Sequence, residues 1–456
     1  MCPKQEIDPT ARLARRAVLW SGSAIAGIAI LRRSALAAAP GCGATSGASG
    51  KIARPADNAA SVPGVNTHIN YLGSTYAKSF STVTKPRLLE LGVRHIRDNP
   101  GGASDSVTKG RFIELARAGI TVLFAASDTD DRLSYVKALN ASGGKVVDAV
   151  EPPNERDNAW GAAMPARMRD FMISMYGRYR ADAATRNVTI LGPSFANTRD
   201  SANKLRAYFP TAANYMTVGN AHSYPGGREP DGRYGGGWGI TLADALARQR
   251  MGSSKPVWAS ECGYKLSGSR SGHHAVTERA AAKYMGRVIL SHLGAGAPRL
   301  YKYQLLNDNA ENFALLNNDG SPRMQFLALR NFMRLFADPG PSFEPGTLAY
   351  SWSGSLTGIK EVLFQKRNGT FYLVVWQAVA SSTVTTTDSG VRDIEPARRA
   401  LTLDLGMRMR AATIYEPAFS PNPVQRLASG TGLTSLSLRV PDHIQVVELV
   451  PSICGT

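Results

Sequence analysis

From about residue 62 to residue 340, short apolar or β-branched runs alternate with amphipathic stretches long enough for helices. This alternation is typical of βαβ units and predicts a parallel sheet. The predicted strands cover residues 64–66, 93–97, 121–125, 146–150, 189–192, 216–220, 257–260 and 300–303. The predicted helices cover residues 85–91, 109–118, 131–140, 163–184, 202–208, 242–251, 274–292 and 324–336. Eight strands, each followed by a helix, are what a closed (β/α)8 TIM barrel requires.

An open, doubly wound α/β sheet is the competing architecture, but no GxGxxG motif follows the first strand to support dinucleotide binding. After residue 340 the hydrophobic period changes from helical to alternating, which predicts strands at 359–366, 370–376, 399–405, 410–415, 435–440 and 444–449. Asn368-Gly369 supplies the positive φ of a hairpin turn between the first two of these predicted strands. We therefore expect a linker at 40–61, a catalytic barrel at 62–340 and a small antiparallel β-sandwich at 341–456.

The first 39 residues have the order of an export signal. Arg15-Arg16 precedes an apolar stretch at 17–31, and Ala37-Ala38-Ala39 follows as a small-residue cleavage site. The paired arginines indicate the twin-arginine route and a periplasmic or secreted protein. The apolar stretch is shorter than the about 20 residues that span a bilayer. It is also expected to be removed with the signal, so no stable membrane insertion of the remaining protein is expected. A retained anchor stays open as the alternative.

Composition narrows the class of protein. The chain has 456 residues, 43% of them hydrophobic, and only four cysteines, which excludes disordered, collagen-like and disulfide-dense proteins. The formal net charge of +18 favours attraction to anionic polymers. No nucleic-acid-binding motif accompanies that charge, so nucleic acid is not an expected partner. A monomer is the default expectation.

Two predicted barrel strands lead into glutamates. The fourth is followed by Glu151-Pro152-Pro153-Asn154-Glu155, and the seventh by Glu261. Barrel active sites lie at the C-terminal ends of the strands. Retaining glycoside hydrolysis needs two carboxyl groups about 5–5.5 Å apart, which strand ends across a barrel mouth can supply. The same region has no HExxH or similar ligand spacing, so neither a metal nor another cofactor is expected.

With Asn154-Glu155 after the fourth strand and Glu261 after the seventh, the sequence resembles the clan A glycoside hydrolases, also called the 4/7 superfamily. The resemblance implies a retaining glycosidase that acts on a polysaccharide or oligosaccharide through a covalent glycosyl-enzyme. It implies that Glu155 is the general acid/base, that Glu261 is the nucleophile and that Asn154 binds a substrate hydroxyl. Two departures, Arg156 directly after the acid/base and tyrosines in place of a tryptophan at the eighth strand, leave the substrate family open.

The resemblance also assigns supporting residues. Arg97 after the second strand would lower the pKa of Glu261 by charge pairing, while the neighbouring charge would raise that of Glu155. His222 and Tyr224 follow the sixth strand, and Tyr224 would donate a hydrogen bond to the nucleophile. Glu151, the rival acid, is expected to be solvated or structural.

Aromatic residues near strand ends are candidates for sugar stacking. The predicted substrate-binding set is completed by His68, Tyr303, Trp160 and Trp238. Trp258 is instead expected inside the barrel, and Cys262 between the barrel and its helices.

The substrate itself is not fixed by the sequence. Arg156, Arg228 and Arg233 would suit an acidic substrate such as a uronic-acid polymer, or they are solvated loop charges. Sugar, linkage, endo or exo action and the role of the sandwich stay open. Two alternatives to hydrolysis remain, namely a transglycosylase using the same site and a non-catalytic carbohydrate-binding protein.

Overall fold

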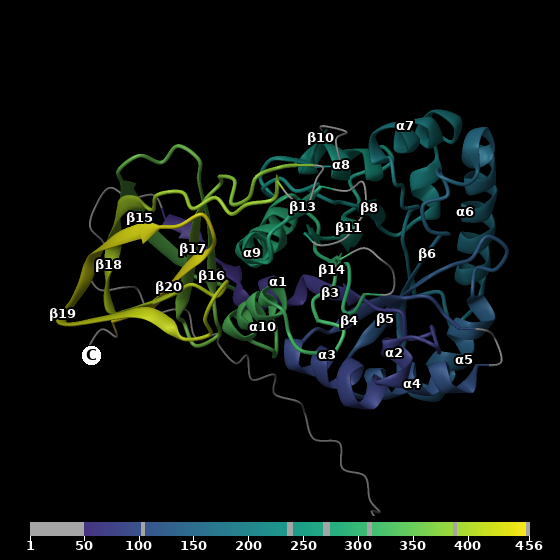
Figure 1. The fold of residues 1–456 in the computed structure, drawn as a ribbon, viewed down its shortest axis with the longest axis horizontal. Helices are drawn as coiled ribbons and strands as arrows, with labels where there is room; N and C mark the ends of the chain where they lie inside the picture. Colours follow the sequence, from purple (N-terminus) through teal and green to yellow (C-terminus); the bar gives the residue numbers. More distant parts are fainter. Residues whose placement is uncertain are drawn as a thin grey trace, which may run out of the picture. The chain divides into compact units, whose positions relative to one another are not determined.

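The computed structural model describes residues 50–101, 105–234, 240–267, 274–307, 312–385 and 390–452, apart from the side chains of Arg233, Tyr234 and Ser429 (Figure 1). The expected export signal, the first part of the linker and Trp238 lie outside these residues. No helix of the described segments is long and apolar enough to cross a membrane.

Eight parallel strands form the first large sheet, in the order β7-β6-β5-β4-β3-β14-β11-β8. Their bounds are β3 (Pro63–Asn66), β4 (His95–Asp98), β5 (Thr121–Ala125), β6 (Val147–Glu151), β7 (Thr189–Ile190), β8 (Gly219–His222), β11 (Val257–Cys262) and β14 (Leu300–Lys302). A parallel bridge between Leu191 and Val218 joins the two edges beyond β7 and before β8. The sheet therefore closes on itself, and the predicted barrel is confirmed.

The barrel is filled by its own side chains. One buried hydrophobic cluster gathers residues from around the ring: Leu123, Ala149, Leu191, Val218, Trp258 and Tyr301. Trp258 thus lies inside the barrel, as predicted. Gly64 leaves room for this packing, because a Cβ there would lie 2.8 Å from a ring carbon of Tyr301.

Helices cover the outside of the barrel. They are α1 (Ala56–Ser61), α2 (Thr75–Lys78), α3 (Lys85–Leu91), α4 (Ser106–Arg117), α5 (Leu133–Gly143), α6 (Met164–Ala181), α7 (Thr198–Tyr208), α8 (Leu242–Gln249), α9 (Glu278–Gly294) and α10 (Met324–Phe336). Several begin at a side-chain cap, as α8 does at Thr241, whose hydroxyl accepts from the backbone N–H of Asp244. Cys262 is buried in the large cluster between barrel and helices, as predicted, and burial raises the pKa of its thiol to about 12.

The second large sheet is mostly antiparallel, in the order β1-β15-β18-β20-β17-β16-β2, with β19 paired to β18. The bounds are β1 (Gly50–Ile52), β2 (Arg54–Pro55), β15 (Thr347–Ser353), β16 (Ile359–Gln365), β17 (Phe371–Gln377), β18 (Arg399–Tyr415), β19 (Pro423–Val440) and β20 (Gln445–Pro451). The first part of β18 pairs with β15 and the second part with β20. Residues from both parts share one hydrophobic core, so the sheet folds over itself.

Two features of this domain differ from the sequence expectation. The strands expected at 399–405 and 410–415 are one continuous strand, β18, with register shifts between Asp404 and Ala411. Within the segment expected to be a linker, β1 pairs with β15 and β2 with β16, and α1 packs on α10. These strands are too short to produce a visible alternation, so composition alone suggested a linker.

Helix α9 joins the barrel to the C-terminal sheet (Figure 1). Arg287 is wholly buried and donates to the Asp231 carboxylate, at 2.8 Å, and to the backbone carbonyls of Val379 and Asp442, both at 2.8 Å. One turn earlier, Lys283 pairs with Asp442 at 2.9 Å. This junction is therefore held by two buried cations, Arg287 and Lys283, whose N–H groups donate to carboxylates and backbone carbonyls.

Replacing Arg287 by leucine leaves the Asp231 carboxylate and two carbonyls without their donor. We expect Arg287→Leu to lower the free energy of unfolding by about 3–5 kcal/mol. The control is Arg279→Ala on the same helix, where an exposed ion pair with Glu395 is lost at a cost of about 0–1 kcal/mol. Urea unfolding followed by tryptophan fluorescence measures both. Equal effects would show that Arg287 does not hold the junction.

Candidate active site

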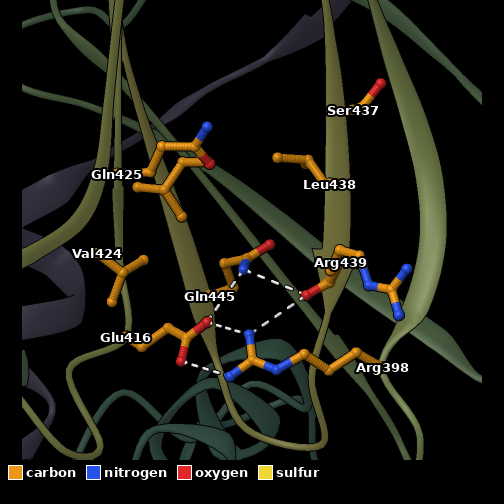
Figure 2. Close-up of a pocket in the computed structure, with 9 residues that line it drawn as sticks. Arg398, Glu416, Val424, Gln425, Ser437, Leu438, Arg439 and Gln445 are labelled. Atoms are coloured by element: carbon orange, nitrogen blue, oxygen red, sulfur yellow. Dashed lines mark hydrogen bonds and ion pairs between the residues drawn. The ribbon is translucent and has the colours of Figure 1, made fainter.

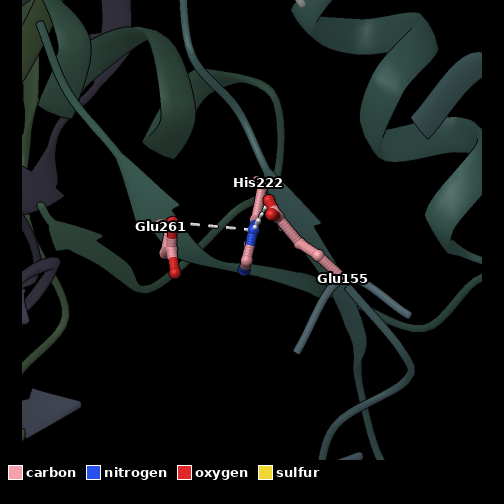
Figure 3. Close-up of side chains that lie close together, drawn as sticks. All are labelled: Glu155, His222 and Glu261. Carbon is pink, nitrogen blue, oxygen red and sulfur yellow. Dashed lines mark hydrogen bonds and ion pairs between the residues drawn. The ribbon is translucent and has the colours of Figure 1, made fainter. Parts of the chain in front are cut away.

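The functional residues predicted after strands β4, β6, β8 and β11 converge at one end of the barrel. Figure 3 shows His222 between Glu155 and Glu261. One ligand-type atom from each of the three lies within 4.8 Å of the others. The two carboxylates that the sequence singled out, 106 residues apart, are thus brought together.

Glu155 reaches this position through an unusual backbone conformation. It has φ +46°, in the left-handed region that non-glycine residues rarely adopt. The residue lies in a turn after β6, and this turn directs its side chain toward His222. Such conformations persist where the surroundings impose them, and they concentrate at functional sites.

A β-bulge on β11 places Glu261. Trp258 pairs with Asn220 of β8, and Glu261 pairs with His222. Between these two pairs, β11 therefore contains one residue more than β8. Trp258 faces the barrel interior, and strict alternation would therefore turn Glu261 outward. The extra residue returns Glu261 to the inside and leaves Cys262 in the outer core.

Arg97 is the buried centre of the site. Its guanidinium donates to Glu151 at 2.6 Å, to Glu261 at 2.7 Å and to the Asn154 side-chain oxygen at 2.6 Å. Burial opposes the charge of Arg97, but the charges of Glu151 and Glu261 outweigh burial and raise its pKa. The predicted pairing of Arg97 with Glu261 is therefore present in the structure.

Tyr224 completes the contacts of Glu261. Its hydroxyl donates to the second carboxylate oxygen at 2.7 Å, as the sequence predicted. Burial and the nearby Glu261 charge raise the pKa of this phenol well above its ordinary value, so it stays a donor. Each oxygen of Glu261 is thus held by a different donor.

Glu155 and His222 form a hydrogen-bonded pair, with 2.6 Å between His222 Nδ1 and the carboxylate. Burial alone would raise the pKa of Glu155, but the His222 charge and hydrogen bond lower it below the ordinary value. The expectation of a raised pKa is therefore wrong, because His222 faces this carboxylate and its charge favours the ionised form. Burial lowers the pKa of His222, yet the charges of Glu261 and Glu155 raise it overall.

Three further residues support the site, and two of them, Asn220 and Ser260, were not assigned these roles from the sequence. Glu151 is wholly buried, and Asn220 donates to its second oxygen at 2.7 Å. Ser260 lies 3.1 Å from Nε2 of His222. Glu151 is therefore structural rather than solvated, since it balances the charge of Arg97. The only sequence signal was its position at a strand end.

The predicted aromatic residues divide into two groups. His68 stacks on Tyr71 and meets Tyr303 edge-on, while Phe313 lies edge-on to both Tyr303 and Tyr224. These rings form an aromatic wall beside Glu261, and Tyr71 and Phe313 are additions that the sequence analysis did not identify.

Trp160 is placed elsewhere. It is buried in a cluster with methionines of α6, and the guanidinium of Arg167 covers its ring at 4.2 Å. Its predicted role in sugar stacking therefore has no geometric support. Arg156 pairs with Asp128 at 2.5 Å, and Arg228 donates to the carbonyl of Gly226 in its own loop.

The carboxylates and imidazole are also ligand types for a divalent cation. A cation bound by all three would have to displace the direct bond between His222 and Glu155. It would also compete with Arg97 and Tyr224 for the oxygens of Glu261. The arrangement is thus built from hydrogen bonds, and cofactor-free chemistry stays a prediction.

No protein-family model matches the sequence, and no curated protein matches it. Solved structures do match. A glucosidase from Croceicoccus marinus has a TM-score of 0.56 and 9% identity, covering 82% of this chain and 93% of its own. A family 51 α-L-arabinofuranosidase from Bifidobacterium longum has a TM-score of 0.54 and 14% identity, covering 88% and 97%.

A GH30 endoxylanase from Clostridium papyrosolvens is also similar, with a TM-score of 0.51 and 13% identity over 89% of this chain and 98% of its own. At such low identity the similarity establishes the fold. The expected architecture, a TIM barrel with an appended C-terminal β-domain, is confirmed, and it is the fold of these glycoside hydrolases.

The pairing of His222 with Glu155 predicts a measurable titration. We expect a His222 pKa above 6.5 in the wild type and a lower one in Glu155→Gln, because the variant loses a raising charge while burial remains. Since the folded-state pKa of His222 is raised, its pairing with ionised Glu155 contributes stability that is fully present below pH 6.5 and is lost as the pH rises through the folded value. At low pH, protonation of Glu155, whose pKa is lowered, removes the pair. NMR titration of the His222 ring signals measures its pKa in the wild type and in Glu155→Gln.

His292 provides an internal control in the same spectra, because burial lowers its pKa to about 4 and it contacts neither glutamate. An unchanged His222 pKa in Glu155→Gln would contradict the proposed electrostatic coupling.

Proposed function

We propose that the protein is a retaining glycoside hydrolase, with Glu261 as nucleophile and Glu155 as general acid/base. The observation that carries the proposal is the approach of their carboxylate oxygens to within 4.8 Å. This separation suits the retaining mechanism, whose carboxyl groups lie about 5–5.5 Å apart, and leaves less room than the inverting one requires. The glycosidase fold of the barrel supports the same conclusion.

The surroundings of Glu261 suit a nucleophile. Arg97 and Tyr224 each donate to one oxygen of its carboxylate, and these two hydrogen bonds orient the group that would attack the anomeric carbon. Asn154 is fixed by its bond to Arg97, so its amide N–H₂ is oriented to donate to a substrate hydroxyl. The attack forms a covalent bond between a Glu261 oxygen and the sugar.

The pair of Glu155 and His222 supplies the proton. Their 2.6 Å contact is a hydrogen bond, and the lowered pKa of Glu155 with the raised pKa of His222 favours the proton on the imidazole in the free site. Transfer to Glu155 prepares the carboxylic acid, which then protonates the leaving oxygen. In the second step Glu155 accepts a proton from water, and that water releases the sugar from Glu261.

We also propose that the enzyme is exported and that its substrate is a polysaccharide or oligosaccharide, neutral or acidic. The export signal at residues 1–39 supports the first point. The aromatic wall of His68, Tyr71, Tyr303 and Phe313 supports the second, because ring faces and edges suit the apolar faces of sugars. Sequencing the N-terminus of protein recovered outside the cytoplasm tests export.

Activity is tested by incubating the protein without residues 1–39 with neutral and uronic-acid polysaccharides and following new reducing ends. We expect release by the wild type and none by Glu261→Gln. Glu155→Gln should lose about 10²–10⁴-fold on these substrates, and less on aryl glycosides, whose phenolate leaves without a proton. The first anomer released, followed by NMR, should keep the configuration of the substrate.

Glu344→Gln is the matched control, because Glu344 is exposed and distant in sequence from the site. Equal activity in Glu261→Gln and Glu344→Gln would remove Glu261 from the mechanism. Saccharide binding without turnover by the wild type would indicate the carbohydrate-binding alternative, and longer products with added acceptor sugars would indicate transglycosylation.

A further inference from the structure

A pocket of about 290 Å³ lies in the C-terminal sheet, and Figure 2 shows that the carboxylate of Glu416 there is bound by neighbouring side chains. Glu416, directly after β18, accepts hydrogen bonds from Arg398 at 2.8 Å and from Gln445 at 3.2 Å. Arg398 precedes β18 and Gln445 begins β20, so these bonds join the ends of strands. A second network of charged groups, at the barrel, acts instead on the turn that carries Glu155.

We call residues 154–160, which follow β6, the Glu155 turn. Backbone hydrogen bonds close it: the N–H of Asn158 donates to the carbonyl of Glu155 at 3.2 Å, and that of Trp160 to the carbonyl of Arg156 at 2.8 Å. Glu155 itself has φ +46°, a conformation that is unfavourable for a residue with a side chain and persists where the surroundings impose it. Contacts from outside the turn are therefore needed to keep the Glu155 carboxylate beside His222.

Asp157 binds one side of the turn to the start of α7. One of its carboxylate oxygens accepts from the backbone N–H of Ala196 at 3.1 Å. The other accepts from the backbone N–H of Asn197 at 2.9 Å and from the hydroxyl of Ser201 at 2.8 Å. Since Asn197 is the N-cap of α7, the negative charge also lies where the helix dipole favours it. Three donors therefore fix the position of Asp157, two residues after Glu155.

Asp128 holds the other side of the turn. It lies in the loop after β5, where one carboxylate oxygen is 2.5 Å from Nε of Arg156 and the other accepts from the indole N–H of Trp160 at 3.4 Å. Trp160 is buried in the methionine cluster of α6, so this end of the turn is anchored in a hydrophobic core. Because β5 and β7 are the neighbours of β6 in the sheet, the Glu155 turn is held from the loops that follow both adjacent strands.

Asp157 also acts on the charge of Glu155. Burial raises the pKa of the Glu155 carboxyl, and the charge and hydrogen bond of His222 lower it below the ordinary value. The charge of Asp157 raises this pKa and so offsets part of the effect of His222. Because a general acid must carry its proton when the leaving oxygen departs, this direction favours the first step of the proposed reaction.

We propose that Asp157 and Asp128 are positioning residues, which hold the Glu155 carboxylate beside His222 and within reach of the leaving oxygen. This assignment depends on the proposed function through the role of Glu155 as general acid/base. A general acid works only within hydrogen-bond reach of the atom that it protonates, and a displacement of about 1 Å can cost about 10²-fold in rate. Arg156 and Trp160 then act on the position of Glu155 and not on the sugar.

The position of Glu155 can be followed without turnover, through the pKa of His222. Burial lowers that pKa, and the charges of Glu261 and Glu155 raise it overall, so moving Glu155 away should lower it. We expect Asp157→Ala to lower the His222 pKa, in the same direction as Glu155→Gln, in an NMR titration of the ring signals. Asp157→Asn removes the same charge but keeps one acceptor oxygen, so it should lower the pKa less.

Hydrolysis gives a second measurement, which separates position from stability. Asp157→Ala should lower kcat/KM on oligosaccharides by about 10–10²-fold, because their leaving oxygen needs the proton of Glu155. On an aryl glycoside the phenolate leaves without a proton, so kcat/KM should change by less than about twofold. Asp128→Ala should show the same selective loss, and it provides both measurements if Asp157→Ala does not fold.

Asp182→Ala is the matched control. Asp182 directly follows α6, accepts from the backbone N–H of Ala184 at 2.9 Å and pairs with Lys137 at 2.5 Å, so it anchors a loop at the other end of that helix. We expect it to leave both measurements unchanged.

An equal loss on both substrates, an unchanged His222 pKa in Asp157→Ala, or an equal pKa change in Asp157→Asn would overturn the proposal. A wild type that hydrolyses no saccharide, with the His222 pKa still lowered in Asp157→Ala, would overturn the proposed function alone.

Discussion

A buried guanidinium must be matched by negative charge, and Arg97 imposes this condition on the whole barrel mouth. Its bonds to Glu151, Glu261 and Asn154 require β4, β6 and β11 to end at the same height. Glu151 balances the cation without entering the chemistry, since Asn220 holds its other oxygen. Glu261 is then paired with a cation inside the barrel, through the 2.7 Å bond to Arg97. The position of the proposed nucleophile therefore follows from the need to pair one cation.

The two proposed catalytic glutamates are placed by departures from regular structure. Glu261 faces inward only because β11 contains a bulge, and Glu155 meets His222 from a left-handed backbone conformation. Regular strands would have pointed one carboxylate into the outer core and carried the other along the strand direction. The eight-stranded barrel supplies rigidity, and these local irregularities adjust its side chains to the short separation that double displacement requires.

Hydrophobic periodicity was sufficient to predict the barrel, because each strand and helix buries its own apolar face; α10 has the predicted bounds, 324–336. The positions of Glu155, Glu261 and Arg97 at strand ends were sufficient to predict that these residues lie together. Periodicity could not reveal what depends on distant partners. The lowered pKa of Glu155 requires His222, and the burial of Trp160 requires the methionines of α6. The pairing of β1 and β2 with the C-terminal sheet involves strands too short to carry a pattern.

The C-terminal sheet also takes part in shaping the barrel mouth. Asp231 belongs to the loop that follows Tyr224, and its carboxylate is held by Arg287 of α9 and by the indole N–H of Trp376 on β17. Tyr224, seven residues earlier, donates to Glu261. One end of this loop is thus fixed to the proposed nucleophile and the other to the β-domain. Because both anchors are buried hydrogen bonds to charged groups, a separated barrel would lose the second and leave Arg287 uncompensated. The β-domain is therefore part of the support of the candidate active site.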